Sequence, residues 1–227
     1  MPQAGPFAVK NLKAVRFSLL NEDGSPQCPG TDFSAWSPCP QSLSTARQTS
    51  AAATTELRCG DGSIADSDTT PETVTGDQLT IVFSKQEFET IALATGATPI
   101  IDGGTVIGYL DPATDHEPEP VEVNAFAVNR TGNANAPAPY SHLQLVWPYV
   151  KFRLGDDAVS QEYLTATIIG TATPNAAIAD GAFNDFPTSL NGRYRGRWAT
   201  DEVPDAADTP YSTAPLGGFI DTPACAS

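Results

Sequence analysis

Few side chains in this sequence have the types and spacing that catalysis or metal binding needs. The two histidines, His116 and His142, have no Cys, His or Asp-x-His neighbour at the spacing of a metal site. The segments DGG at Asp102 and GDD at Gly155 read as turns, and no G-x-S-x-G, S-x-x-K or phosphate-binding glycine motif occurs. We therefore expect a protein that is not an enzyme, with no catalytic residue, no bound metal and no cofactor.

The acidic residues are too numerous for any one pair of them to be informative. A run from Asp111 to Glu119 has carboxylates at spacings that suit calcium, but it lacks the central Gly and terminal Glu of an EF-hand loop. The carboxylate spacing that glycoside hydrolysis needs is set by the fold. With 27 Asp and Glu in the chain, a pair at some spacing carries no weight.

One basic segment, RYRGRW, stands out from this acidic background. Arg193, Arg195 and Arg197 alternate with other residues, so in a strand they would share one face. Such a row of arginines could bind either phosphates or carboxylates. Because the formal net charge is −15, we favour the carboxylates of a neighbouring subunit over nucleic acid, with plain surface solvation as the alternative.

Composition narrows the class of protein further. No run approaches the roughly 20 apolar residues of a membrane span, and the N-terminus has no apolar core of signal-peptide type. We expect a protein made and kept in a cytoplasm that does not bind membranes. Its four cysteines, Cys28, Cys39, Cys59 and Cys225, are then free thiols, with a Cys28–Cys39 disulfide as the alternative.

Residue patterns predict a mainly β fold with many turns. Period-2 alternation or β-branched and aromatic residues indicate strands over residues 12–20, 54–59, 73–83, 103–111, 120–128, 141–154 and 162–173. We expect a hairpin at Asn191-Gly192, an acidic turn over residues 60–72 and a long Pro/Gly-rich loop near residues 21–50. The prediction is one β-sandwich or partial-barrel domain over residues 1–200 with an extended N-terminal arm, followed by an extended C-terminal arm over residues 201–227.

A single helix interrupts the strands, and its ends are well marked. Ser84 and Glu87 have the spacing of a capping box, and Phe83 and Phe88 that of a hydrophobic staple. Gly96 suits the C-terminal cap. The pattern predicts a helix that starts after Ser84 and packs against the sheet.

The predicted helix has one apolar stripe and one polar side. The stripe consists of Phe88, Ile91, Ala92 and Thr95. We expect the polar side, with Lys85 and Glu89, to face solvent or a neighbouring subunit.

Two segments carry a resemblance to a known family. They are TVTGDQLTIVFSKQEFETIALATGATPI, residues 73–100, and LVWPYVKFRLGDDAVSQEYLTATIIGTATPNAAIADGAFNDFP, residues 145–187. In the order strand, helix ending at glycine, WPYVKF strand and long Thr/Ala/Ile strand, the chain resembles the tail tube (major tail) proteins of long-tailed, non-contractile bacteriophages of the siphophage type. The likeness covers about half of the chain and lies in pattern rather than in an invariant motif.

This resemblance implies a structural virion protein. Subunits of that family form hexameric rings that stack into a hollow tube through which double-stranded DNA passes without specific binding. Implied partners are further copies, the tape measure, the terminator and the distal tail protein. The implied location is the virion tail, assembled in the host cytoplasm. An acid-lined lumen would repel phosphates over about 8 Å at physiological salt, although the resemblance leaves the lumen-facing acids unassigned.

Two other kinds of protein remain open at this point. Another virion component, such as a tail terminator, a baseplate ring protein or a capsid decoration protein, would share the same β-rich, acidic, arm-bearing design. A carbohydrate-binding or carbohydrate-hydrolysing β-sandwich is the second alternative. In that case Trp36, Trp147 and Trp198 would be candidates for a sugar platform, although core or interface positions suit them equally.

Overall fold

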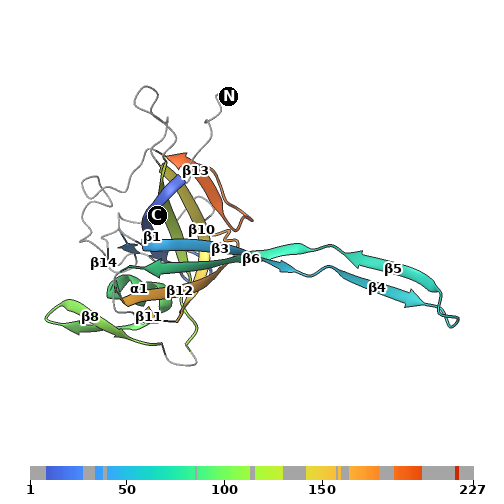
Figure 1. Cartoon of the computed structure of the whole chain (residues 1–227), viewed down its shortest axis with the longest axis horizontal. Coiled ribbons are helices and arrows are strands. Elements are labelled where there is room, and N and C mark those ends of the chain that lie inside the picture. The colour runs from blue at the N-terminus through green and yellow to red at the C-terminus, as the bar shows by residue number, and fades with distance from the viewer. Residues whose placement is uncertain are drawn as a thin grey trace, which may run out of the picture.

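The computed structural model describes residues 9–27, 34–37, 40–84, 86–112, 116–129, 142–156, 158–159, 164–178, 187–200 and 218–219. These residues form one ten-stranded antiparallel sheet, two separate two-stranded hairpins and one short helix (Figure 1). The predicted fold class, mainly β with a helix packed on the sheet, is confirmed.

The large sheet has a simple antiparallel order with two side branches. Its main path runs β14 (Gly218–Phe219), β2 (Ser34–Ser37), β1 (Val9–Leu19), β9 (Val121–Asn129), β10 (His142–Leu154), β12 (Leu164–Ala172), β6 (Thr73–Phe83) and β3 (Pro40–Ser50). The branches are β13 (Gly196–Thr200) beside β10 and β11 (Ala158–Val159) beside β12.

The long central strand β10 changes neighbours at a bulge. Residues His142 to Val146 pair with β9 on one side and β13 on the other, whereas Val150 to Leu154 pair with β12. The shift lies around Pro148, which has no backbone N–H to give to a ladder. The sheet turns a corner here and curls until β1 contacts β3, five positions away along the main path. The result is a partial barrel rather than two stacked sheets.

The hydrophobic core fills the concave side of this curl. Phe17 of β1 lies with its ring centroid 5.9 Å from Phe152 and 6.3 Å from Phe83. Gly170 of β12 leaves room for Phe152, since a Cβ at Gly170 would come within 2.6 Å of that ring. The core also includes Val15, Ala35, Leu79, Ile81, Ile91, Val121, Val123, Trp147, Val150 and Ile168.

The helix begins later than the sequence predicts. Helix α1 spans Phe88–Thr95, and its N-cap residue is Glu87, which makes no side-chain cap hydrogen bond. The predicted Ser84 cap is therefore wrong. Strand β6 continues to Phe83, which pairs with both neighbouring strands, so the chain must leave the sheet before a helix can start. The predicted C-terminal end is confirmed by Gly96 in the left-handed conformation, with φ of 70°.

The single apolar stripe predicted for this helix is also wrong. All six residues from Thr90 to Thr95 are buried, because α1 lies between the large sheet and the hairpin β7 (Thr98–Asp102) and β8 (Thr105–Leu110). Figure 1 shows this hairpin beyond the helix. Glu89 is half-buried, and Lys85 lies outside the described residues. None of the described helices is long and apolar enough to cross a membrane.

Two segments that the sequence assigns to a loop or a turn contain strands. The predicted loop over residues 21–50 contains β2 and all of β3, and the predicted acidic turn over 60–72 contains β5 (Ile64–Thr70). The Asn191-Gly192 turn does form, with the Arg193 N–H donating to Leu190 O at 2.8 Å. However, β13 after it pairs with β10 instead of with the preceding segment, so the predicted hairpin is wrong.

Candidate assembly surfaces

A two-stranded arm projects from the end of the β3–β6 ladder, far beyond the rest of the chain (Figure 1). We define the arm as residues 51–72, which include β4 (Ala53–Arg58) and β5 (Ile64–Thr70). Every one of these residues is exposed. The arm therefore adds nothing to the core, and an isolated hairpin is at best marginally stable in water. A surface to which the arm docks would explain why the chain carries it.

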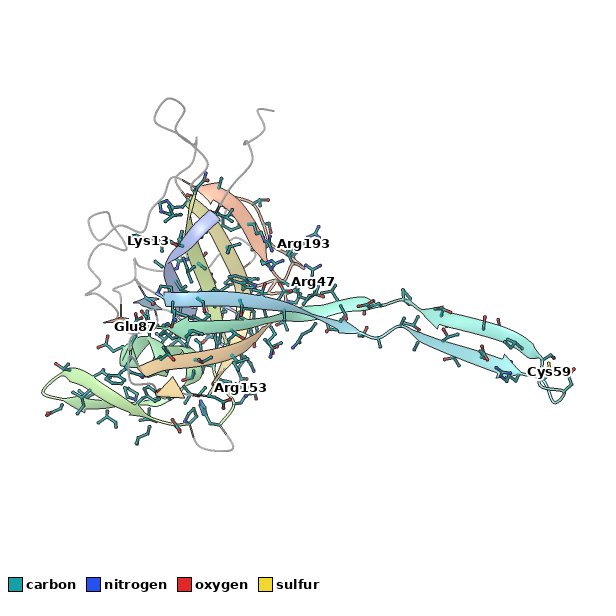
Figure 2. The ribbon with its side chains drawn as sticks, viewed as in Figure 1. Lys13, Arg47, Cys59, Glu87, Arg153 and Arg193 are labelled. Carbon is teal, nitrogen blue, oxygen red and sulfur yellow. The ribbon has the colours of Figure 1, made fainter. Side chains whose placement is uncertain are left out.

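Local hydrogen bonds give the arm its shape. At the tip, Asp61 Oδ1 accepts from the Ser63 backbone N at 2.9 Å and from Ser63 Oγ at 2.6 Å. These bonds lower the pKa of Asp61. Gly62, between them, has φ of 86°, which glycine adopts without strain. The free, exposed Cys59 lies next to this turn (Figure 2).

The two faces of the arm differ in charge. Leu57 is directly opposite Asp66, and Thr55 is directly opposite Asp68, so these four side chains share one face. We call it the acidic face. Glu56 lies on the other face and pairs with Arg58 at 2.5 Å. The acidic face thus carries two carboxylates without a basic residue.

Arginines gather where the arm leaves the sheet. Asp77 of β6 is buried and lies 3.7 Å from Arg47 Nε and 3.5 Å from Arg195 Nη1. Burial lowers the pKa of Arg195; Asp77 opposes this effect, and the nearby Arg197 and Arg47 add to it. We call Arg47, Arg193, Arg195 and Arg197 the arginine cluster. Figure 2 shows Arg47 and Arg193 near each other in this view, close to the base of the arm.

Two contacts fix this cluster to the base of the arm. The Tyr194 hydroxyl donates to Val74 O at 2.6 Å, and Arg195 Nη1 donates to Thr45 Oγ1 at 3.3 Å. The segment before β13 is thereby held across β3 and β6. These contacts hold the cluster in place. Arg195 is its one arginine that, like Asp77, is largely buried.

The β7–β8 hairpin forms the second exposed surface. Ile100, Ile101, Ile107 and Leu110 are all exposed, and the other exposed large hydrophobic side chains of the described residues, Leu57 and Ile64, lie on the arm. Large apolar side chains on surfaces usually mark contact sites when they are clustered. The hairpin is held in place through Tyr109, whose ring packs edge-on against Phe88 of α1 with centroids 6.1 Å apart.

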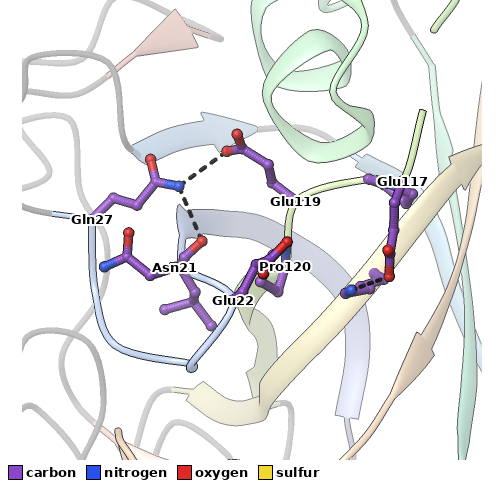
Figure 3. A pocket seen from close by; sticks show the side chains of 9 residues that line it. Asn21, Glu22, Gln27, Glu117, Glu119 and Pro120 are labelled. Carbon is purple, nitrogen blue, oxygen red and sulfur yellow. Dashed lines mark hydrogen bonds and ion pairs between the residues drawn. The ribbon is translucent and has the colours of Figure 1, made fainter. Parts of the chain in front are cut away.

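A polar hollow lies between the turn after β1 and the segment before β9 (Figure 3). Gln27 Nε2 donates to Glu119 Oε2 at 3.0 Å, and Lys151 Nζ donates to Glu117 Oε1 at 2.5 Å. The hydrogen bond between Lys151 and Glu117 raises the pKa of Lys151 and lowers that of Glu117. Throughout the described ranges, no three His, Cys, Asp or Glu side chains come together as metal ligands. The hollow holds paired charges but no nucleophile beside a base.

The residues predicted to lie between subunits are dispersed in the structure. Arg193 and Arg197 are exposed, whereas Arg195 binds Asp77 of its own chain, and only Arg197 lies within a strand. Glu89 is half-buried beside the helix start. Their role between subunits stays a prediction. Sequence reasoning missed Arg47 and Asp77, because β3 has no apolar alternation that would have marked it as a strand next to β6.

The histidines and tryptophans occupy ordinary structural positions. His142 is buried at the start of β10, and His116 is exposed but packs against Gly96, where a Cβ would collide with its ring. Trp147 is buried in the core, and Trp198 Nε1 donates to Gln144 Oε1 at 2.7 Å. The Trp36 side chain lies outside the described part. Neither of the two described indole rings is free to form a sugar platform.

Comparisons with known proteins give little beyond this geometry. No protein-family model and no curated protein matches the chain. A solved structure of the anti-feeding prophage cap (AFP tube terminating cap) is similar over 88% of this chain and 97% of that chain, with 12% identity and a TM-score of 0.34. Similarity at this level identifies neither a shared fold nor a shared function.

Proposed function

We propose that this chain is a structural subunit of a phage-type tail, and that it forms hexameric rings that stack into a hollow tube. The observation that carries the proposal is the arm, a 22-residue projection in which every residue is exposed. A hairpin that buries nothing in its own subunit has a function only if it binds another molecule, and a second copy of the chain is always present.

The position of the arm favours open-ended assembly. Figure 1 places it at one end of the molecule and the β7–β8 hairpin at the other. Contacts between different surfaces of identical subunits generate rings when the rotation closes and filaments when it does not. A tube of stacked rings uses both: closed contacts around each ring and open contacts along its axis.

The sheet edge and the charge suit the same proposal. β3 is an edge strand of 11 residues, and an uncovered edge of that length invites pairing with another chain. The net charge of −15 suits a conduit that DNA must cross without binding. Tape measure, terminator and distal tail proteins would be the further partners, in the tail of a virion assembled in the host cytoplasm.

Electron microscopy of the purified wild-type protein tests this function directly. We expect tubes or six-fold rings in negative stain, and a monomer that persists at high concentration would contradict the proposal. Single rings that never stack would favour the alternative of a terminator, baseplate or decoration protein. Binding on a glycan array would favour the carbohydrate-binding alternative.

An arm variant separates stacking from folding. We would replace residues 52–71 with an Asn-Gly turn, so that β3 and β6 remain joined. Because the arm contributes no buried surface, we expect circular dichroism and the thermal midpoint to stay near wild type while stacking is lost. Normal tubes from this variant would show that the arm is not an assembly element.

A further inference from the structure

The arginine cluster has more positive charge than the described residues around it neutralise. Arg47 and Arg195 share the single carboxylate of Asp77, and Arg197 is close enough to affect Arg195. The guanidinium groups of Arg193 and Arg197 make no ion pair or hydrogen bond with any described residue. Among the described residues, Asp77 is thus the one carboxylate that pairs with the cluster, in a protein whose net charge is −15.

The arm, in contrast, has an excess of negative charge. Residues 51–72 contain five acids and one base, and that base, Arg58, is paired with Glu56 on the face away from Asp66 and Asp68. Asp66 and Asp68 are two residues apart in β5, so their carboxylates are spaced by about 7 Å along one face. Arg193 and Arg197 flank Arg195 and are four residues apart in the sequence.

The acidic face cannot neutralise the cluster of its own chain. Asp68 is nine residues from Asp77 along the same extended hairpin, a separation of about 30 Å. The arm would have to fold back on itself to close this gap, whereas it points away from the rest of the chain (Figure 1). The acidic face can therefore reach the arginine cluster of another copy but not that of its own chain.

We propose that the acidic face of the arm of one copy docks on the arginine cluster of a neighbouring copy, with Asp66 and Asp68 beside Arg193 and Arg197. This inference rests on the proposed function and identifies the surface on which the arm docks. Arginine forms paired hydrogen bonds with carboxylates, so the contact fixes register as well as adding attraction. Because the two surfaces differ and lie apart on each copy, the contact is head-to-tail and can repeat from one copy to the next.

A charge-swap experiment on the full chain tests this contact. We expect Asp66→Arg with Asp68→Arg to raise the critical concentration for assembly at least about tenfold, because arginines would then face arginines. Arg193→Asp with Arg197→Asp should have the same effect. The chain that carries all four changes should assemble again, since the charges are complementary once more. Pelleting and negative stain give the readout.

Matched controls keep the result interpretable. Glu56→Gln removes a carboxylate from the opposite face of the arm and should leave the critical concentration within about twofold of wild type. All variants alter exposed side chains, so their thermal midpoints should remain unchanged. Raising salt from 50 mM to 500 mM should weaken wild-type stacking.

The possible failures are distinguishable. If both charge-reversed pairs assemble like wild type while the 52–71 replacement does not, the arm docks elsewhere and this inference is wrong although the proposed function stands. If the four-fold variant fails to assemble while remaining folded, direct pairing is contradicted. If the 52–71 replacement also forms normal tubes, the arm has no part in assembly and both proposals lose their basis.

Discussion

The Arg16 guanidinium donates to Glu122 Oε1 at 3.0 Å in the interior of the protein, with side-chain exposures of 1% and 0%. Asn124 also donates to this carboxylate, and Gln144 Nε2 donates to Asn124 Oδ1 at 2.9 Å. Trp198 completes the chain of hydrogen bonds through Gln144. This polar layer links β1, β9, β10 and β13 on the side of the sheet opposite the hydrophobic core.

We predict that Arg16→Met destabilises the chain by about 3–5 kcal/mol, because it leaves the Glu122 carboxylate buried without its ion-pair partner. Urea unfolding of the unassembled protein measures the change. Adding Glu122→Leu should recover part of the loss, and Lys13→Met, at an exposed position of the same strand, should cost less than about 0.5 kcal/mol. A small effect of Arg16→Met would contradict the assignment of a buried ion pair.

Asn175 joins two turns that are distant in sequence. Its side-chain Nδ2 donates to Gly24 O at 2.9 Å and to Pro148 O at 3.1 Å, while its Oδ1 accepts from the Ala177 N–H at 2.9 Å. We predict that Asn175→Ala costs about 2–3 kcal/mol in urea unfolding, since buried backbone groups lose their partners. Asn191→Ala, at an exposed turn, is the control. Equal effects of the two substitutions would argue against this role for Asn175.

The tip of the arm should respond to acid. The hydrogen bonds from Ser63 lower the pKa of Asp61, so this group stabilises the turn above its unfolded pKa of about 3.9. That stabilisation is lost as the pH falls through the lower folded value. An NMR titration should show Asp61 titrating below the usual range, and Ser63→Ala should move its pKa upward.

Asp23 provides an internal control for this titration. It accepts from Ser25 N and Oγ in the same way, and its pKa is likewise lowered. Ser63→Ala should leave the titration of Asp23 unchanged. An Asp61 that titrates at the ordinary value in the wild-type protein would mean that the tip turn is not formed in solution.

The isoleucines of the β7–β8 hairpin should matter for assembly rather than for folding. Ile101 and Ile107 are 63% and 53% exposed, so replacing both with serine should change the free energy of unfolding by less than about 0.5 kcal/mol each. We expect the same variant to assemble only at higher concentration, as measured by sedimentation. Thr105→Ser on the same hairpin is the control. Wild-type assembly of the double variant would exclude this surface as an interface.

The strands that have a buried face could be predicted from the sequence, and those without one could not. Leu79, Ile81 and Phe83 alternate along β6, and its bounds match the prediction. β3 and β5 show no such alternation, because solvent covers most of both their faces, and only their backbone pairing with β6 and β4 makes them strands. Alternation of apolar and polar residues reflects the burial of one face of a strand, so it is absent where a strand buries neither face.

The candidate surfaces could be foreseen only in part for a related reason. The sequence places Arg193, Arg195 and Arg197 together, but the register that brings Arg47 and Asp77 to them is a long-range property of the sheet. The late start of α1 has a similar cause. Local capping signals at Ser84 compete with the pairing of Phe83 in β6, and the sheet prevails.

The arm also separates two constraints on substitution, folding and assembly, which act on the same residues in most proteins. Substitutions in residues 51–72 change no buried contact, whereas substitutions in β9 or β10 change many. A saturation-mutagenesis library scored for assembly of the protein would therefore record, within the arm, tolerance of the assembly alone. Its tip, around Cys59, is a natural place to insert a peptide for display along a filament.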